Sequence, residues 1–153
     1  MTKSQLLFMV ALFLLYLGIN SCGSNETKPL NPNGDSELAL LMRDMHENGM
    51  VVKQQLIAGQ NPDLTIDCEK LFTAKPTEPD KVADPRYAGY AKAYESAVKS
   101  FRQEYNSDRV GTYQTMVDAC MNCHKEVCPG PMVKIKRMYL SKEEMASLEG
   151  NQE

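Results

Sequence analysis

The chain has 153 residues, of which 42% are apolar and 24% are charged. This composition is typical of one globular domain and excludes a disordered chain. Its 17 basic and 20 acidic side chains give a net charge of −3, which makes nucleic acid, with its phosphate backbone, a poor partner.

Residues 1–21 predict an export signal that does not belong to the fold. Lys3 precedes an apolar run over 6–19, which is short for a membrane span and suits the core of a signal peptide. The run ends in Asn20-Ser21-Cys22, and a small residue before a cysteine resembles the signal of a bacterial lipoprotein. The resemblance implies a lipid on Cys22, although an ordinary cleaved leader and an uncleaved anchor helix remain alternatives.

The lipoprotein resemblance also implies a location. A lipid on Cys22 anchors the chain to a bacterial membrane, facing the periplasm, and Ser24 favours the outer membrane over the inner one. Residues 22–34 are rich in Gly, Pro, Asn and Ser and predict a flexible tether. Loss of Lys3 with the leader leaves a net charge of −4, and the resulting field favours partners with basic patches.

Four helices are predicted in the domain over 35–140. The first spans about 36–58, with Asp35 or Ser36 as its cap. Its apolar stripe has the three- and four-residue spacing of a helix that faces a core, and consists of Leu38, Met42, Met45, Gly49, Val52 and Leu56. A shorter second helix starts at Asn61-Pro62-Asp63, which supplies a cap and a proline in the first turn.

The third helix is predicted to start at Asp84-Pro85 and to carry a tyrosine-rich stripe as far as Tyr105. Asn106 or Ser107 is the expected cap of the fourth helix, which extends to about Val127.

The segment Cys128-Pro129-Gly130-Pro131 ends the fourth helix. A short amphipathic piece is expected over 132–140, and 141–153 is expected to be a polar tail. Four helices with short connections predict an all-α fold, an antiparallel up-and-down four-helix bundle with a cofactor between its helices.

The chain has five cysteines, and two of them belong to a heme attachment motif. Cys120, Cys123 and His124 fit C-x-x-C-H, in which both thiols add to the vinyl groups of heme c and the histidine binds the iron. Positions i, i+3 and i+4 of a helix lie on one side, so one turn presents all three side chains to one ring. The sequence therefore predicts one covalent heme c, with His124 as the proximal iron ligand.

Half of a zinc site and a thioredoxin-like redox pair are alternative interpretations of the motif. Zinc would need a second pair of ligands, which only Cys68, Cys128 and His46 offer, and a redox pair expects strands that the sequence does not show. The motif and the export signal together favour heme. Since an exported location is oxidising, we expect a disulfide between Cys68 and Cys128, with two unpaired buried thiols as the alternative.

A C-x-x-C-H motif near the end of a four-helix bundle resembles class II cytochromes c, which are the cytochrome c′ group and its low-spin relatives. The resemblance covers about 36–127 and is specific only at the motif. It implies that a residue of the first helix covers the distal side of the heme. Low-spin members have methionine there, so Met45, or alternatively Met42, is the expected distal ligand. The alternative is that both methionines only pack in the core. His46 is expected to face solvent, and ligation of the heme iron by His46 together with His124 is the alternative.

The family's usual basic residues shortly after the histidine are absent from this chain. We expect Lys134, Lys136 or Arg137 either to pair with heme propionates or to mark a docking patch, and a solvated basic face is the alternative.

The resemblance implies a carrier of single electrons rather than an enzyme. Its expected partners are periplasmic or membrane redox proteins, and a homodimer is possible. A five-coordinate heme protein that binds a diatomic gas such as nitric oxide is the alternative. A heme-free lipoprotein with a disulfide between Cys120 and Cys123 is a third interpretation.

Overall fold

The computed structural model describes residue 5 and residues 34–103 and 108–150. The chain separates into two units, 1–32 and 33–153, and helices α2 to α8 belong to the second. Apart from residue 5, the predicted leader, Cys22 and the tether up to residue 33 lie outside the described residues. All regular structure in the described part of the chain is helical, as predicted. No helix among the described residues has the length and apolar character needed to cross a membrane.

Three long helices correspond to the first, third and fourth predicted helices. They are α2 (Glu37–Ile57), α5 (Tyr87–Phe101) and α6 (Arg109–Glu126). Ser36 caps α2, since its side chain accepts a hydrogen bond from the backbone N–H of Ala39 at 3.2 Å. The prediction of Ser36 as cap is therefore confirmed.

The cap of α6 differs from the prediction. The side chain of Asp108 accepts a hydrogen bond from the backbone N–H of Gly111 at 2.7 Å. Asp108 is thus the N-cap of α6, rather than Asn106 or Ser107, which both lie outside the described residues.

The predicted second helix is wrong over most of its length. Residues 60–67 have no helical structure, and the helices in this region are only α3 (Lys70–Thr73) and α4 (Pro79–Ala83). The alternation of buried and exposed residues indicates an extended chain with period two, in which Leu64, Ile66 and Cys68 are buried while Thr65 and Asp67 are exposed. The described residues therefore contain three long helices, and the predicted antiparallel four-helix bundle is not confirmed.

Two arginines hold this extended segment against the long helices. Arg102 donates hydrogen bonds to the carbonyl oxygens of Leu64 at 2.7 Å and Ile66 at 2.6 Å. Arg109 donates to the carbonyl oxygens of Pro62 and Phe101. These contacts satisfy backbone groups that a helix would have satisfied internally.

The short piece expected over 132–140 is helical, and residues 142–150, which we expected to belong to a polar tail, are helical as well. We call residues 132–150 the C-terminal segment. It comprises α7 (Met132–Ile135), the 3-10 helix η1 (Lys136–Met138) and α8 (Lys142–Gly150). Leu148 of α8 is buried, so this segment contributes to the core. The segment is ordered because it packs against one side of α2. The spacing of apolar residues within the segment does not reveal this long-range contact.

Lys53 and Tyr113 hold the C-terminal segment in place. Lys53 is only 7% exposed, and its Nζ donates to the carbonyl oxygens of Arg137 at 3.2 Å and Tyr139 at 2.8 Å. Its Nζ also lies 3.0 Å from a carboxylate oxygen of Glu144. Tyr113 lies on α6, and its hydroxyl is 2.9 Å from the carbonyl oxygen of Met138.

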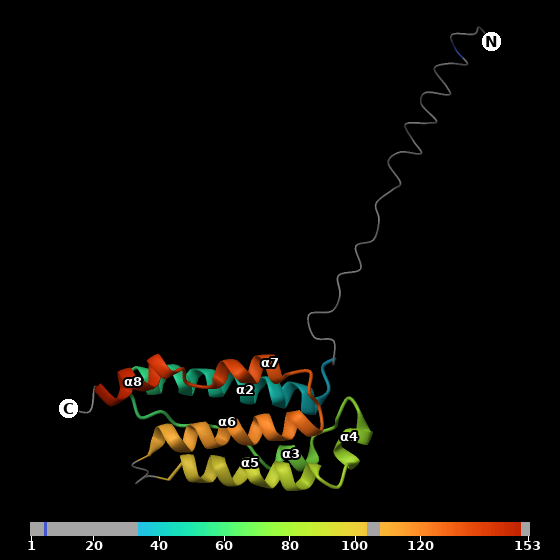
Figure 1. Cartoon of the computed structure of the whole chain (residues 1–153). Coiled ribbons are helices and arrows are strands. Elements are labelled where there is room, and N and C mark those ends of the chain that lie inside the picture. Colours follow the sequence, from blue (N-terminus) through green and yellow to red (C-terminus); the bar gives the residue numbers. More distant parts are fainter. Residues whose placement is uncertain (1–4, 6–33, 104–107, 151–153) are drawn as a thin grey trace. The chain divides into compact units, whose positions relative to one another are not determined.

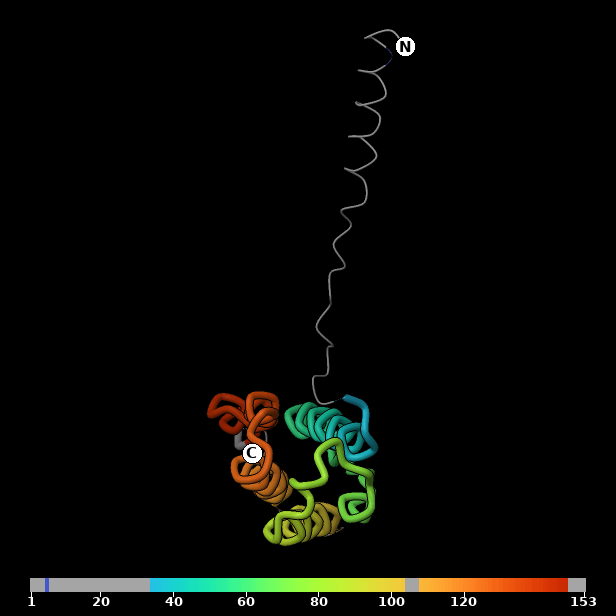
Figure 2. Tube along the Cα trace, turned by 90° about the vertical axis from the view of Figure 1, so that its right-hand side faces the viewer, coloured from blue at the N-terminus to red at the C-terminus, as the bar shows by residue number. Residues whose placement is uncertain are grey.

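The elements surround one core, which Figure 2 shows end-on. In order around the core, α2 is followed by the C-terminal segment, α6, α5 and α3. Figure 1 shows α5 and α6 side by side and antiparallel. The fully buried side chains at the centre are Val52, Leu64, Val98, Phe101, Tyr113, Met116 and Val117.

Candidate functional site

A cavity of about 40 Å³ lies between α2, α3, α5 and α6. It is lined by all three residues of the predicted heme motif on α6, which are Cys120, Cys123 and His124. Met42 and Met45 of α2 line the same cavity. The structure thus brings together the two thiols, the imidazole and the two thioethers that sequence analysis selected.

The imidazole of His124 is oriented by the chain that ends α6. Its Nδ1 lies 2.9 Å from the carbonyl oxygen of Cys128. A carbonyl oxygen only accepts hydrogen bonds, so Nδ1 carries the proton and Nε2 keeps its lone pair. Burial lowers the pKa of His124 below 6.5, an effect to which Lys81 adds and which the Cys128 carbonyl opposes. His124 is therefore a neutral imidazole with Nε2 as its ligating atom.

The two thiols of the motif are held in their protonated forms. Burial raises the pKa of Cys120 to about 12, and the neighbouring Cys123 adds to this shift. The pKa of Cys123 is raised chiefly by burial and secondarily by Cys128. These raised pKa values are opposite in direction to the depressed pKa of a redox-active cysteine.

The two methionines differ in burial. Met45 is 7% exposed and belongs to the core, whereas Met42, one turn earlier, is partly buried. Both face α6 across the cavity, and a thioether is a ligand of heme iron.

Tyrosines of α5 form another wall of the cavity. Tyr87, Tyr90 and Tyr94 line it together with Ala91, so the tyrosine stripe faces the site. The hydroxyl of Tyr87 donates to the carbonyl oxygen of Leu71 at 2.8 Å, which ties α5 to α3. Burial is the main cause that raises the pKa of Tyr87 to about 12 and also raises the pKa of Tyr94.

The chemistry of the lining suits a heme, but the present volume does not. A space of about 40 Å³ holds about three water molecules, far less than a porphyrin. The thiols, the imidazole and the thioethers are the groups that hold heme c, and aromatic walls suit its apolar ring. A heme would therefore fit only after the side chains that line the cavity move apart.

The structure shows Cys68 and Cys128 as free thiols and no disulfide between them. Cys68 is buried, and its Sγ lies 4.0 Å from the carbonyl oxygen of Ile66. Cys128 lies at the end of α6, where its Sγ is 3.8 Å from Nζ of Lys81. The extended conformation around residue 68 places the two thiols in different surroundings, which the sequence alone did not reveal.

His46 differs from the solvent-facing side chain that we expected. The residue is half-buried, and its Nε2 is buried without a hydrogen-bond partner. His46 does not line the cavity of the heme motif. Among the described residues, no group of three His, Cys, Asp or Glu side chains has the arrangement of a metal site.

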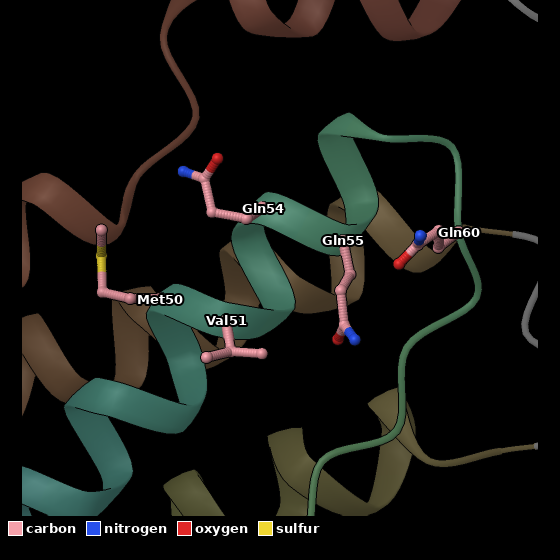
Figure 3. Close-up of a pocket in the computed structure, with 5 residues that line it drawn as sticks. All are labelled: Met50, Val51, Gln54, Gln55 and Gln60. Carbon is pink, nitrogen blue, oxygen red and sulfur yellow. The ribbon is translucent and has the colours of Figure 1, made fainter.

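A second hollow, of about 430 Å³, lies over the C-terminal half of α2. Figure 3 shows its lining residues, which are Met50, Val51, Gln54, Gln55 and Gln60. The lining contains no histidine, cysteine or charged side chain, so this hollow offers no group for catalysis.

In comparisons of sequence and structure, no family model, no curated protein and no solved structure matches this chain.

Proposed function

We propose that this chain is an exported, lipid-anchored c-type cytochrome that carries single electrons between redox proteins. The observation that carries the proposal is the lining of one cavity by Cys120, Cys123 and His124 on one side and by Met42 and Met45 on the other. In this arrangement the two thiols hold one heme c by thioether bonds. When bound, the heme supplies a one-electron iron couple.

The protein's own residues determine what that iron can do. Nε2 of His124 would bind the heme iron, because Nδ1 is engaged by the carbonyl oxygen of Cys128. The thioether of Met45 would be the second protein ligand of the iron, since Met45 is the more buried of the two methionines. Ligation on both sides leaves no position for a substrate, and sulfur ligation favours a raised reduction potential. We therefore assign electron transfer rather than an enzymatic activity.

Membership of class II cytochromes c is part of the proposal. A motif near the end of a long helix, with methionines on the first long helix, supports it. The extended chain at 60–67 departs from four long helices. The lipid on Cys22, the periplasmic location and the membrane anchor rest on the signal sequence alone.

The absorption spectrum of the matured protein, recorded in both redox states, tests the proposal. We expect the bands of six-coordinate, low-spin heme in the reduced state, unchanged by nitric oxide or carbon monoxide on mixing. High-spin bands and rapid gas binding would favour the cytochrome c′-like alternative. A sample without heme bands, with Cys120 and Cys123 in a disulfide, would favour the heme-free lipoprotein.

A further inference from the structure

The end of the chain contains a strongly basic segment in an acidic protein. Residues 127–142 have four basic side chains and no acidic one, whereas the whole chain has 17 basic and 20 acidic side chains. Three of the four, Lys134, Lys136 and Arg137, are exposed on α7 and η1. Positive charge is therefore concentrated on the neighbouring helices α7 and η1.

These three cations have no partners within the part of the chain that the structure describes. No ion pair or side-chain hydrogen bond involves Lys134, Lys136 or Arg137, whereas Lys81 and Arg86 both form ion pairs. Val133, beside them on α7, is 66% exposed. We call Val133, Lys134, Lys136 and Arg137 the α7–η1 patch. An exposed apolar residue among unpaired cations is typical of an interface centre and its charged rim.

The α7–η1 patch is held rigidly. Ile135 and Met138 on the opposite side of the segment are buried. Nζ of Lys53 donates a hydrogen bond to the carbonyl oxygen of Arg137. The hydroxyl of Tyr113 lies within hydrogen-bond distance of the carbonyl oxygen of Met138. A partner would therefore meet a preformed surface and lose little conformational entropy in ordering it.

The patch also lies close to the candidate heme site. α7 packs against α6, which carries the heme motif, and η1 packs against α2, which carries Met45. Figure 1 shows α7 beside the half of α6 that ends at Glu126. No residue of the patch lines the cavity, so in this structure the three cations are available to another molecule.

We propose that the α7–η1 patch is the docking surface for a partner protein with an acidic patch. The negative charge of the remaining surface repels such a partner elsewhere, so the charge distribution favours one orientation of encounter. The partner's role as a redox protein rests on the proposed function, whereas the binding itself does not require heme.

Titration of the isotope-labelled protein with an octaglutamate peptide, followed by NMR, tests the binding. We expect amide shifts concentrated at 132–138, and weaker binding at high salt because the charges are screened. The variant K134E/K136E/R137E should lower the affinity by about tenfold. The matched variant K70E/K75E/K92E reverses three exposed, unpaired lysines elsewhere and should leave the affinity for the patch nearly unchanged.

Electron exchange with ferricyanide tests the position of the patch relative to heme. Attraction by the patch predicts that the rate falls with ionic strength despite the negative net charge, and that K134E/K136E/R137E reverses this trend. If the matured protein contains no heme and still binds octaglutamate at 132–138, the proposed function is contradicted and the docking surface is supported. Equal effects of the two triple variants would overturn the docking surface, as would binding to phosphatidylglycerol vesicles but not to octaglutamate.

Discussion

Nδ1 of His124 lies 2.9 Å from the carbonyl oxygen of Cys128, so the residue that follows the end of α6 orients the proposed iron ligand. The contact uses the backbone of Cys128 and leaves its thiol free. The side chain at position 128 is therefore dispensable for the orientation of His124, and so is any disulfide with Cys68.

Labelling of thiols checks the free state of Cys68 and Cys128. Matured protein unfolded without a reductant should take up N-ethylmaleimide at both residues, because the structure shows neither in a disulfide. Peptide mapping by mass spectrometry would identify the adducts. C128A should retain heme and the same absorption spectrum. Labelling of neither residue until a reductant is added would show that the disulfide exists.

Substitution of the methionines separates the two candidates for the distal ligand. Met45 is buried and Met42 is only partly buried, so M45A should convert the reduced heme from low-spin to high-spin bands. M42A, its matched control one turn away, should keep low-spin bands. The opposite result would assign Met42, and low-spin spectra in both variants would exclude methionine ligation.

Removal of the Lys53 ammonium should destabilise the fold. Lys53 is 7% exposed and binds two carbonyl oxygens, those of Arg137 and Tyr139. K53M leaves both without this donor, which costs about 1–3 kcal/mol of unfolding free energy. Urea unfolding measures the loss. K99M, which breaks the exposed pair of Lys99 with Glu95, should leave the stability nearly unchanged, because solvent screens an exposed ion pair. Similar losses in both variants would contradict the assigned role of Lys53.

The carboxylate of Glu144 makes this stabilisation depend on pH. The backbone N–H of Ser141 and the ammonium of Lys53 lower the pKa of Glu144 below 4.5. The pKa of Glu144 is thus lower in the folded than in the unfolded protein. The stabilisation is therefore fully present at a pH above the pKa of the unfolded state, and it is lost as the pH falls through the pKa of the folded state. E144Q, which cannot titrate, should therefore lose less stability than the parent protein between about pH 5 and about pH 3. If the free energy of unfolding depends on pH in the same way in E144Q and in the parent protein, Glu144 makes no such contribution.

Sequence analysis predicted the parts of the fold that local patterns determine. The apolar stripes of α2, α5 and α6 and the cap at Ser36 depend on neighbours three or four residues away. The heme motif is equally local, because Cys120, Cys123 and His124 belong to one helical turn. The resemblance to class II cytochromes added Met42 and Met45, and the structure places both in the same cavity.

Features that depend on distant contacts could not be predicted in this way. The start signal at Asn61-Pro62-Asp63 indicated a helix, but Arg102 and Arg109, which are distant in the sequence, hold this segment extended by hydrogen bonds to its carbonyl oxygens. Lys53 has the sequence pattern of a surface residue and is buried only because the C-terminal segment covers it. Nothing near His46 in the sequence indicated the burial of its Nε2.

A pyridine hemochrome assay tests the central claim most directly. Protein expressed with cytochrome maturation machinery would be extracted with acid and acetone, and the heme that stays with the polypeptide would be quantified. The account predicts one heme c per chain that resists extraction, and its loss in C120A/C123A but not in C68A/C128A. A purified, correctly matured sample that is colourless, or that releases all its heme on extraction, would contradict the account.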